Sequence, residues 1–305
     1  MSHTFNTESK LQGVGIGLRT PHLAELLDPS NALAKKVPWL EILTDNYLNV
    51  GGFYAAHLQA LGERYPLTFH GVGLSIGSES PPNIEYLSAL KALADKHQPV
   101  WISDHLSWSN HQDKRSHDLL PLPYTEENLK RICLQVSQAQ NILERPLLLE
   151  NISAYYEHPN NTLNEASFLN ELCAETGCRT LLDANNLYVN HNNLAYDMDL
   201  YLNSLNFDYV QQLHLGGHEQ RDSLLVDTHG ASICDEVWDL YRKIIAQHGA
   251  IATLIEWDNN VPSLDILMSE KDKADSILLK ETNKKNLKHK CLTAKHDRSV
   301  LWVGQ

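Results

Sequence analysis

The sequence has no arrangement of cysteines that would indicate disulfide bonds or a thiolate metal site. Its five cysteines are an odd number, are scattered along the chain and include no C-x-x-C pair. A chain of 305 residues is also long enough to fold around a hydrophobic core without disulfides. We therefore expect reduced thiols and a cytoplasmic protein. The cysteines are Cys133, Cys173, Cys178, Cys234 and Cys291.

Long hydrophobic runs are missing too. No apolar segment approaches the roughly 20 residues that a membrane helix needs. The opening residues, MSHTFNTESK, are polar and contain no apolar signal core. Hydrophobic residues nevertheless make up 42% of the chain, which is enough for a sizeable core. The composition predicts a globular protein that does not span a membrane, with a flexible lead over residues 1–12.

Positive charge is in short supply. The 25 lysines and arginines stand against 38 acidic residues, which gives a formal net charge of −13. A surface with this charge repels phosphate backbones and anionic membranes, so we expect neither nucleic acid nor a membrane as a partner.

A dinucleotide-binding loop is absent as well, because the glycine-rich stretch GVGIGLR at 13–19 lacks the third glycine of that fingerprint. Its glycines instead indicate a strand that packs closely at the base of a barrel.

Apolar runs alternate with segments of helical periodicity along the chain. About eight strand–helix pairs follow one another between residues 13 and 279. Strands separated by helices form a parallel sheet, and eight such units close it into a barrel. The predicted fold is therefore an α/β TIM (β/α)8 barrel formed by residues 13–279 as a single domain. Residues 280–305 form a basic polar tail, whose last letters, LWVGQ, could dock as a small strand or strap.

Four local predictions accompany this fold. The periodicity predicts one helix over residues 22–36 and a last helix over residues 264–279. Residues 109–123 are expected to form an irregular polar loop. The segment 180–189 is expected to open with a strand that includes the letters LLDANN.

An acid, an amide or a histidine stands where almost every predicted strand ends. In LLLEN at 147–151, for example, three leucines run directly into Glu150 and Asn151. The carboxyl ends of barrel strands meet on one face, where the active sites of such barrels lie, so we expect these side chains to converge. They are His70, Asp104, His105, Glu150, Asn151, Asp183, Asn186, His214 and Glu256, with Asp227 and His229 in the loop after the seventh strand.

All these side chains offer oxygen or nitrogen atoms as ligands. A set of histidines and carboxylates suits iron, manganese or zinc, whereas a set rich in thiolates would suit structural zinc or iron–sulfur clusters. The sequence also contains 16 histidines, and histidine is the commonest metal ligand. Because the donors outnumber the ligands of one metal, they predict two or three metals that share bridging carboxylates.

Several candidates also have a purely structural explanation. His70 could be a hydrogen-bonded core histidine, and Asp183 could cap the turn that follows it. Asn186 could satisfy backbone groups of its loop. Asp104 could orient a ligand histidine, which is the interpretation we favour. One polar centre explains all the positions together, whereas the structural explanations must hold independently at six or more strand ends.

Two further residues are expected beside the centre. Arg19 ends the first predicted strand and could pair with Glu256 across the barrel mouth. His218 follows His214 closely and could contact a substrate or a metal.

Eight motifs, in order along the chain, resemble the DUF692 family, also called UPF0276. That family is described as multinuclear non-heme iron-dependent oxidative enzymes and includes the large subunit of the methanobactin oxazolone-forming enzyme. The resemblance covers residues 13–279 and leaves out the tail. The motifs are HGVGLS (70–75), SDHLSW (103–108), LPLPYTEE (120–127), LLLEN (147–151), LLDANNLYV (181–189), QLHLGGH (212–218), DTHGASICDEVW (227–238) and LIEWD (254–258).

The resemblance implies a barrel that binds two or three iron ions (Fe2+/Fe3+) and uses O2 as a co-substrate. The implied substrate is a ribosomally made precursor peptide, modified at a cysteine and often delivered by a second protein. Glu150 would bridge two metals, and Glu150, His214 and Asp227 would be the catalytic residues. The implied metal ligands are His70, His105, Glu150, Asp183, His214, Asp227, His229 and Glu256, with Asn186 as a weaker candidate. Asp104, Asn151, His218 and Arg19 would contact the substrate or support the ligands.

Two other functions stay open on the sequence. Sugar isomerases and trinuclear zinc phosphoesterases of the endonuclease IV type also use His, Asp and Glu at barrel strand ends, with zinc or manganese and without oxygen. The acidic charge counts against a DNA phosphodiesterase. A non-catalytic protein that stores metal or serves a partner as a scaffold is the other alternative, and the excess of expected ligands counts against it.

Overall fold

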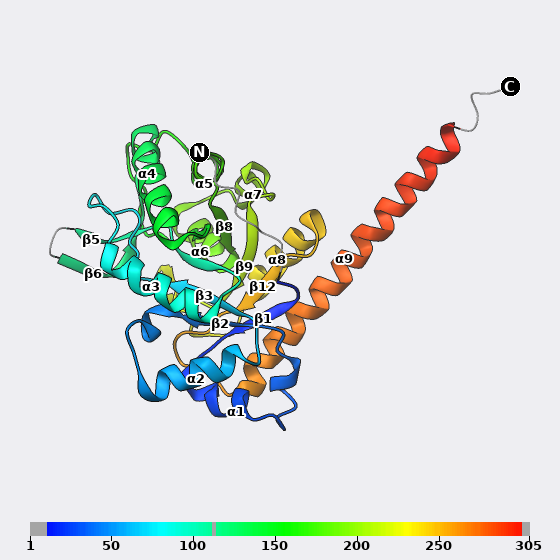
Figure 1. Cartoon of the computed structure of the whole chain (residues 1–305). Coiled ribbons are helices and arrows are strands. Elements are labelled where there is room, and N and C mark those ends of the chain that lie inside the picture. The colour runs from blue at the N-terminus through cyan, green and yellow to red at the C-terminus, as the bar shows by residue number, and fades with distance from the viewer. Residues whose placement is uncertain (1–10, 112–113, 301–305) are drawn as a thin grey trace.

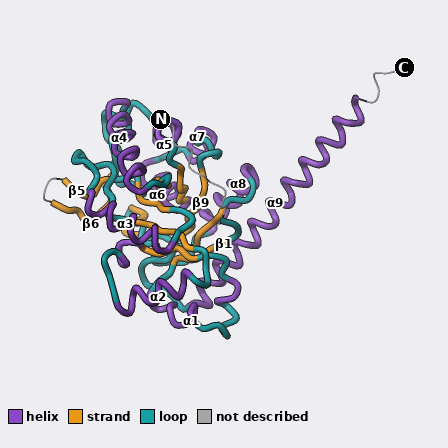
Figure 2. Tube along the Cα trace, in the orientation of Figure 1, coloured by secondary structure: helices purple, strands orange, loops and turns teal. Residues whose placement is uncertain are grey.

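The computed structural model of the chain describes residues 11–111 and 114–300 (Figure 1). The expected docking of LWVGQ lies outside the described residues, and so does most of the flexible lead expected over residues 1–12. Within the described ranges, strands alternate with helices, and Figure 2 shows most of the strands gathered inside a shell of helices. No described helix is both long enough and apolar enough to cross a membrane.

Eight parallel strands close into a barrel in the order β1-β12-β9-β8-β7-β4-β3-β2. This closure confirms the predicted (β/α)8 barrel. Strands β7 and β12, for example, are buried along their whole length, as expected for strands covered by helices on one side and a filled barrel interior on the other. The barrel strands are β1 (Val14–Gly17), β2 (Leu40–Leu43), β3 (Leu67–Gly71), β4 (Ile102–His105), β7 (Leu147–Glu150), β8 (Arg179–Asp183), β9 (Val210–Leu215) and β12 (Ala252–Ile255).

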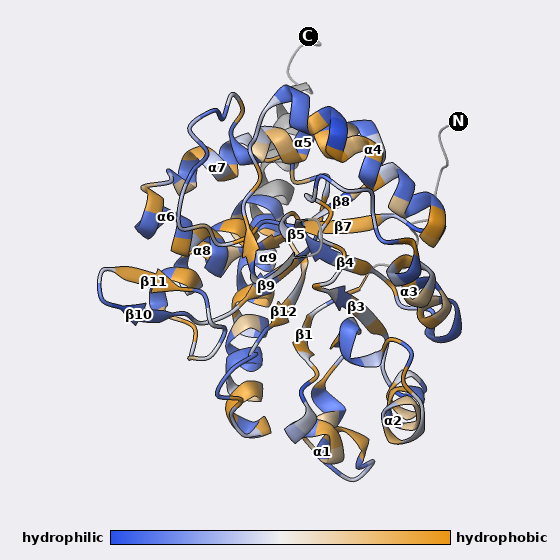
Figure 3. Ribbon diagram, turned by 90° about the vertical axis from the view of Figure 1, so that its left-hand side faces the viewer, coloured by the Kyte–Doolittle hydropathy of each residue, from blue (hydrophilic) through white to orange (hydrophobic). Residues whose placement is uncertain are grey.

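Helices surround the barrel, with their hydrophobic residues towards the strands (Figure 3). Side-chain caps fix where several of them begin: Thr125 accepts a hydrogen bond from the Asn128 amide, and Asn164 accepts one from the Ser167 amide. The helices are α1 (Leu23–Leu27), α2 (Gly52–Gly62), α3 (Ile84–His97), α4 (Glu126–Leu143), α5 (Glu165–Thr176), α6 (Ala184–Leu194), α7 (Met198–Ser204), α8 (Asp235–His248) and α9 (Leu264–Val300).

Close packing at the base of the barrel explains the early glycines. A Cβ atom on Gly15 would lie 2.4 Å from the ring of Trp39, so only glycine fits at this position of β1.

Two of the local predictions named the wrong secondary structure for part of their segment. The expected helix over 22–36 ends at Leu27, because Asp28 precedes Pro29 and adopts an extended conformation, and only a short 3-10 turn (Ala34–Lys36) follows. The expected polar loop at 109–123 contains an antiparallel hairpin of β5 (Trp108–His111) and β6 (Lys114–Leu120). The hairpin was missed because it lies outside the barrel sheet, and its polar sequence lacks the alternation of a half-buried strand.

Two other elements end elsewhere than expected. The strand expected to include LLDANN stops at Asp183, and α6 begins at Ala184, so Asn186 lies in a helix. The last helix was expected to end at residue 279, but α9 continues to Val300, and its second half extends away from the barrel (Figure 1). Residues 280–300 contain neither proline nor glycine, so nothing in the sequence interrupts the helix.

Candidate metal centre

The buried polar side chains of the strand ends converge at the carboxyl end of the barrel. All but His229 lie within one residue of the carboxyl end of a barrel strand, so the closure of the sheet brings them together. Charged and imidazole groups at such depth need partners, because an unpaired buried charge is costly. They are His70 on β3, His105 on β4, Glu150 on β7, Asp183 on β8 and His214 on β9, with Glu256 after β12 and His229 in the loop region between β11 and α8.

Three overlapping sets of ligand atoms form within this cluster, the atoms of each set lying within 4.8 Å of one another. Glu150 belongs to the first and second sets, and Glu256 belongs to the second and third. The sets therefore form a continuous row across the barrel mouth. Their members are His70, His105 and Glu150; then Glu150, Asp183, His214 and Glu256; then His229, Glu256 and Asp258.

Glu150 has the geometry of a bridging carboxylate. Its Oε2 atom lies 3.4 Å from His70 Nε2 and 3.5 Å from His105 Nε2. Its Oε1 atom lies 3.5 Å from His214 Nδ1. Because the two oxygens face histidines of different sets, one carboxylate can serve a cation on each side.

The second half of the row is built in the same way. His214 Nδ1 lies 2.8 Å from Glu256 Oε2, which in turn lies 3.4 Å from His229 Nδ1. On its other side, His229 Nε2 lies 3.0 Å from Asp227 Oδ1 and 3.5 Å from Asp183 Oδ2. Asp227 therefore joins the cluster through His229, at its more exposed edge.

The atoms that face the centre of the cluster fit a metal better than they fit one another. Although neighbouring atoms are close, these buried atoms make no hydrogen bond of acceptable geometry. Two ligands about 2.1 Å from one metal are separated by roughly 3.0 to 3.4 Å, which matches the contacts above. The buried atoms that face another ligand and have no hydrogen-bond partner are Glu150 Oε2, Asp183 Oδ2, His214 Nδ1 and His229 Nε2.

Electrostatics within the cluster also favours cations. Burial alone lowers the pKa of His214, but the carboxylates of Glu41, Glu256 and Glu150 outweigh it and hold the pKa well above its usual value. Burial lowers the pKa of His105 too, and Glu150 and Asp104 raise it to about 9. Without metal the carboxylates thus keep protons on the imidazoles, and metal ligation would have to displace those protons.

Asp183 serves both the fold and the cluster. Its Oδ1 atom caps α6 by accepting the Asn186 amide at 2.6 Å, as the structural explanation expected, while its Oδ2 atom faces His229. Asn151 fixes the backbone of Asp183 with two hydrogen bonds. Its side chain donates to the Asp183 carbonyl at 3.0 Å and accepts from the Asp183 amide at 2.8 Å. Asn186 donates to the Asn151 carbonyl at 3.1 Å and keeps its own oxygen free.

Asp104 and Ser103 hold the two histidines of the first set. Asp104 Oδ1 accepts the His105 amide at 2.7 Å and lies 3.8 Å from His105 Nδ1, so it supports this histidine from behind. Ser103 Oγ lies 2.8 Å from His70 Nδ1, which leaves His70 Nε2 directed at Glu150. Asp104 is absent from the three ligand sets of the described residues.

Arg19 and His218 lie at the rim. Arg19 forms an ion pair with Asp258 and lies 3.7 Å from Glu256 Oε1, which confirms the expected pairing across the barrel mouth. His218 Nδ1 lies 2.8 Å from Asn185 Oδ1, and Asn185 donates to Asp227 at 2.9 Å. His218 is thus linked to Asp227 through the side-chain amide of Asn185.

The chain was compared with known families, proteins and structures. Residues 13–279 match the family described as the RiPP precursor modification enzymes MbnB/TglH/ChrH. The chain belongs to this family.

Similar proteins carry the UPF0276 designation, as the sequence motifs implied. One from Acaryochloris marina is 45% identical over 268 residues, which is 88% of this chain and 95% of that protein. One from Caulobacter vibrioides is 44% identical, with the same coverage. The resemblance stated from the motifs is thereby confirmed.

Solved structures share the fold at low sequence identity. An L-ribulose 3-epimerase superposes with a TM-score of 0.61 at 14% identity, covering 94% of this chain and 99% of that one. The endonuclease IV of Thermus thermophilus gives a TM-score of 0.54 at 15% identity, covering 90% and 99%. These likenesses show the TIM barrel alone.

The sequence did not predict the residues that support the cluster from inside the barrel. Glu41 on β2 is buried, and its Oε1 atom lies 3.0 Å from His214 Nε2. Thr68 and Gln212 donate to its Oε2 atom, at 3.0 and 2.6 Å. This carboxylate is placed to accept a proton from His214 Nε2, which would leave Nδ1 free for a metal. The signal was a lone acid within the apolar run WLEIL. Asp258, the last residue of the motif LIEWD, joins the third set and was not among the predicted ligands.

We expect Glu41→Gln to weaken metal binding about 10- to 100-fold, because the neutral amide no longer fixes the orientation and basicity of His214. Competition with a chromogenic chelator measures the affinity. The matched control is Glu25→Gln on the exposed side of α1, which should bind metal as the unaltered protein does. Equal affinities in the two variants would contradict the role given to Glu41.

Proposed function

We propose that this member of the family is an iron-dependent, O2-using oxidoreductase that modifies a cysteine of a ribosomally made precursor peptide. Family membership supports the modification of a RiPP precursor. The observation that carries the finer proposal is the row of three ligand sets joined by Glu150 and Glu256, the first two of which are buried. A mononuclear zinc or manganese enzyme would have no use for two shared carboxylates.

The ligand chemistry is compatible with iron. The three sets contain only imidazole and carboxylate groups, which suit iron in its ferrous and ferric states. Asp183 and Asp227 add two further carboxylates beside His229. A row with this many acids can balance the charge of two or three cations.

The proposal gives each part of the site a task. Bound iron would supply one-electron chemistry with dioxygen and Lewis acidity towards a thiol. Glu150 and Glu256 would keep neighbouring ions together, while His214, fixed by Glu41, would hold the middle of the row. The buried first and second sets exclude water from the reacting centre.

Asp227 would handle the proton of the substrate. Its side chain is 16% exposed, and burial raises its pKa to about 6, although the neighbouring His229 opposes this. It is therefore ionised at neutral pH and can accept the proton that a peptide thiol releases on binding. Ser153 donates to its other oxygen at 3.2 Å and steadies it at the edge of the site.

The thiol would come from the peptide. No cysteine among the described residues belongs to any of the three ligand sets. The four cysteines whose side chains are described are free, and Cys133, Cys173, Cys178 and Cys234 all lie on or beside the outer helices and strands. A second protein that delivers the peptide, as the sequence resemblance implied, is part of the proposal.

Metal analysis tests the proposal most directly. Protein purified without added metal is expected to contain about two or three irons per chain, because each ligand set can hold one ion. Mössbauer spectra of an iron-57-enriched sample should show exchange coupling between neighbouring ions. Stoichiometric zinc without iron, persisting after expression in iron-rich medium, would instead favour a zinc isomerase or phosphoesterase.

A further inference from the structure

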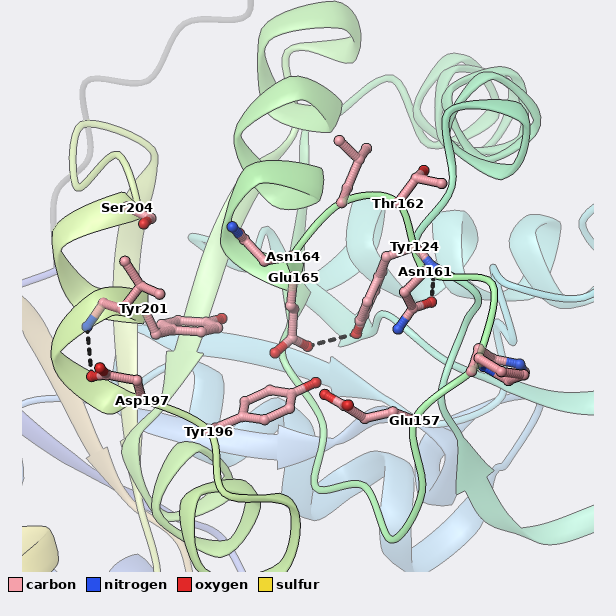
Figure 4. Close-up of a pocket in the computed structure, with 14 residues that line it drawn as sticks. Tyr124, Glu157, Asn161, Thr162, Asn164, Glu165, Tyr196, Asp197, Tyr201 and Ser204 are labelled. Carbon is pink, nitrogen blue, oxygen red and sulfur yellow. Dashed lines mark hydrogen bonds between the residues drawn. The ribbon is translucent and has the colours of Figure 1, made fainter.

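A second group of polar side chains, three of them buried, lies outside the barrel between α5 and α7 (Figure 4). These residues surround a pocket of about 580 Å³. Leu200 at its rim is 60% exposed, so the pocket opens to solvent. The polar residues that line it include Tyr124, Glu157, Glu165, Tyr196, Asp197 and Tyr201.

Glu165 and Tyr201 each present a buried atom without a partner. Glu165 is 4% exposed; its Oε1 atom accepts the Tyr124 hydroxyl at 2.8 Å, but its Oε2 atom has no hydrogen-bond partner. The hydroxyl of Tyr201, a residue 6% exposed, has none either. Figure 4 shows both groups directed into the same space as Tyr196 and Glu157. A buried carboxylate oxygen left unpaired is costly, and a ligand with N–H donors would relieve that cost.

The negative charge of the side chains that line the pocket favours a positively charged ligand. The carboxylates of Glu157, Glu165 and Asp197 line the pocket, and no lysine or arginine among the described residues does. The one basic side chain in this lining is His158, whose Nε2 atom lies 3.0 Å from the Pro121 carbonyl and is occupied there. The tyrosine rings add π faces, which attract cations.

A metal ion is a poor candidate for this space. Among the described residues, none of the sets of three or more ligand atoms close enough to hold a metal includes a residue of this pocket. Tyrosine rings around a single deeply buried carboxylate instead match a cation that has an apolar part.

We propose that this pocket binds an organic cation, an ammonium or guanidinium group, which donates to Glu165 Oε2 and to the Tyr201 hydroxyl among the tyrosine rings. Two sources share this chemistry: the lysine or arginine side chain of a peptide, and a free small amine. Only the peptide source rests on the proposed function, because the binding of a cation does not depend on what the metal centre does.

The chain itself links the pocket to the metal centre. Residues 151–164 run from the end of β7, where Glu150 lies, to the start of α5, where Glu165 lies. On the way, Ser153 and Tyr155 contact Asp227. The first turn of α5 faces the carboxyl end of the barrel, as the helix after each barrel strand does. A basic side chain held here would therefore anchor a peptide on the face that carries the metal centre.

Calorimetry on the full-length protein tests the site with n-butylammonium and ethylguanidinium as probes and 1-butanol as the neutral control. We expect both cations to bind and Glu165→Gln to weaken them at least about tenfold, since the charge is lost while the acceptor for Tyr124 stays. Tyr201→Phe should weaken them about fivefold, because one hydrogen bond is lost. Glu171→Gln, on the exposed side of α5, is the matched control and should bind normally.

Three results would overturn the proposal: no heat of binding at millimolar probe, equal binding of 1-butanol, or unchanged affinity in a Glu165→Gln variant whose circular dichroism shows that it is folded. Tyr201→Phe keeps the ring and provides a second, independent variant should Glu165→Gln fail to fold.

The pH dependence gives a further readout. Burial raises the pKa of Glu165 to about 7, although the Tyr124 hydrogen bond opposes this. The carboxyl is therefore protonated below this pH, and affinity should fall about tenfold for each pH unit below 7. The slope should vanish in Glu165→Gln, and a slope that persists there would contradict the assignment. The groups that face Glu165 from the neighbouring elements are Tyr124, Glu157, His158, Tyr196, Asp197 and Tyr201.

A peptide arm separates the two sources. Acetyl-Ala-Lys-Ala-amide is compared with its norleucine analogue and with n-butylammonium. If the lysine peptide binds at least as tightly as the free amine and the norleucine peptide does not bind, the pocket accepts a peptide side chain. If only the free amine binds, the cation site stands and the peptide source is wrong. Neither outcome depends on turnover, so failure here and failure of the proposed function can be told apart.

Discussion

Replacing Glu150 with glutamine is expected to abolish turnover, with a loss of at least about 1,000-fold. Glu150 directs one oxygen at His70 and His105 and the other at His214. An amide has the same shape but carries no charge, and its nitrogen cannot act as a ligand. The first two ligand sets would lose their common member together, so iron should be lost as well as activity.

Two measurements check this expectation. Elemental analysis gives the iron content, and mass spectrometry follows the oxygen-dependent change in mass of a cysteine-bearing precursor peptide. Glu25→Gln, exposed on α1, serves as the matched control. A Glu150→Gln variant that retained both iron and turnover would rule out the bridging role. If the variant loses iron but the unaltered protein itself shows no turnover, the results would favour a non-catalytic scaffold.

Gly216→Ala is expected to reduce turnover about 100-fold without unfolding the barrel. An alanine Cβ at this position would lie 2.2 Å from His229 Cδ2 and 2.8 Å from His229 Nε2. His229 has a left-handed backbone with a φ of 42°, so it cannot easily adjust, and its ring must leave the cluster. A displacement of about 1 Å at a reacting centre can cost this much.

Iron content, peptide turnover and thermal unfolding together test Gly216→Ala. We expect at least one iron fewer per chain, together with a melting curve close to that of the unaltered protein. Gly51→Ala is the matched control, because Gly51 has an ordinary φ of −123° and no atom within 4 Å of an added Cβ. Full iron and full turnover in Gly216→Ala would mean that His229 is not needed at the centre.

The sequence specified the barrel and the strand-end residues because both depend on local order along the chain. Each barrel strand is marked by an apolar run, and most candidate ligands lie at its carboxyl end, as Glu150 follows three leucines. The closure of a parallel sheet then brings these residues together without further information.

Other parts depended on contacts that no local pattern reveals. Glu41 and Gln212 are 171 positions apart and meet across the barrel interior, so the acid in WLEIL could be interpreted only once the barrel was closed. The two oxygens of Asp183 have separate tasks, which a residue name cannot show. The pocket at Glu165 joins residues of α5 and α7 with loop residues and with Tyr124, and no local pattern shows that they meet.

The shared carboxylates make the row of ligand sets thermodynamically coupled. An ion that fixes Glu150 from one side changes the affinity of the next set, and linkage requires the reverse effect to be equally large. Glu256 passes the same coupling on to His229 and Asp258. Ions bound at neighbouring sets would therefore change one another's affinity, and the iron content of a variant would report on the whole row instead of on the single ligand that was changed.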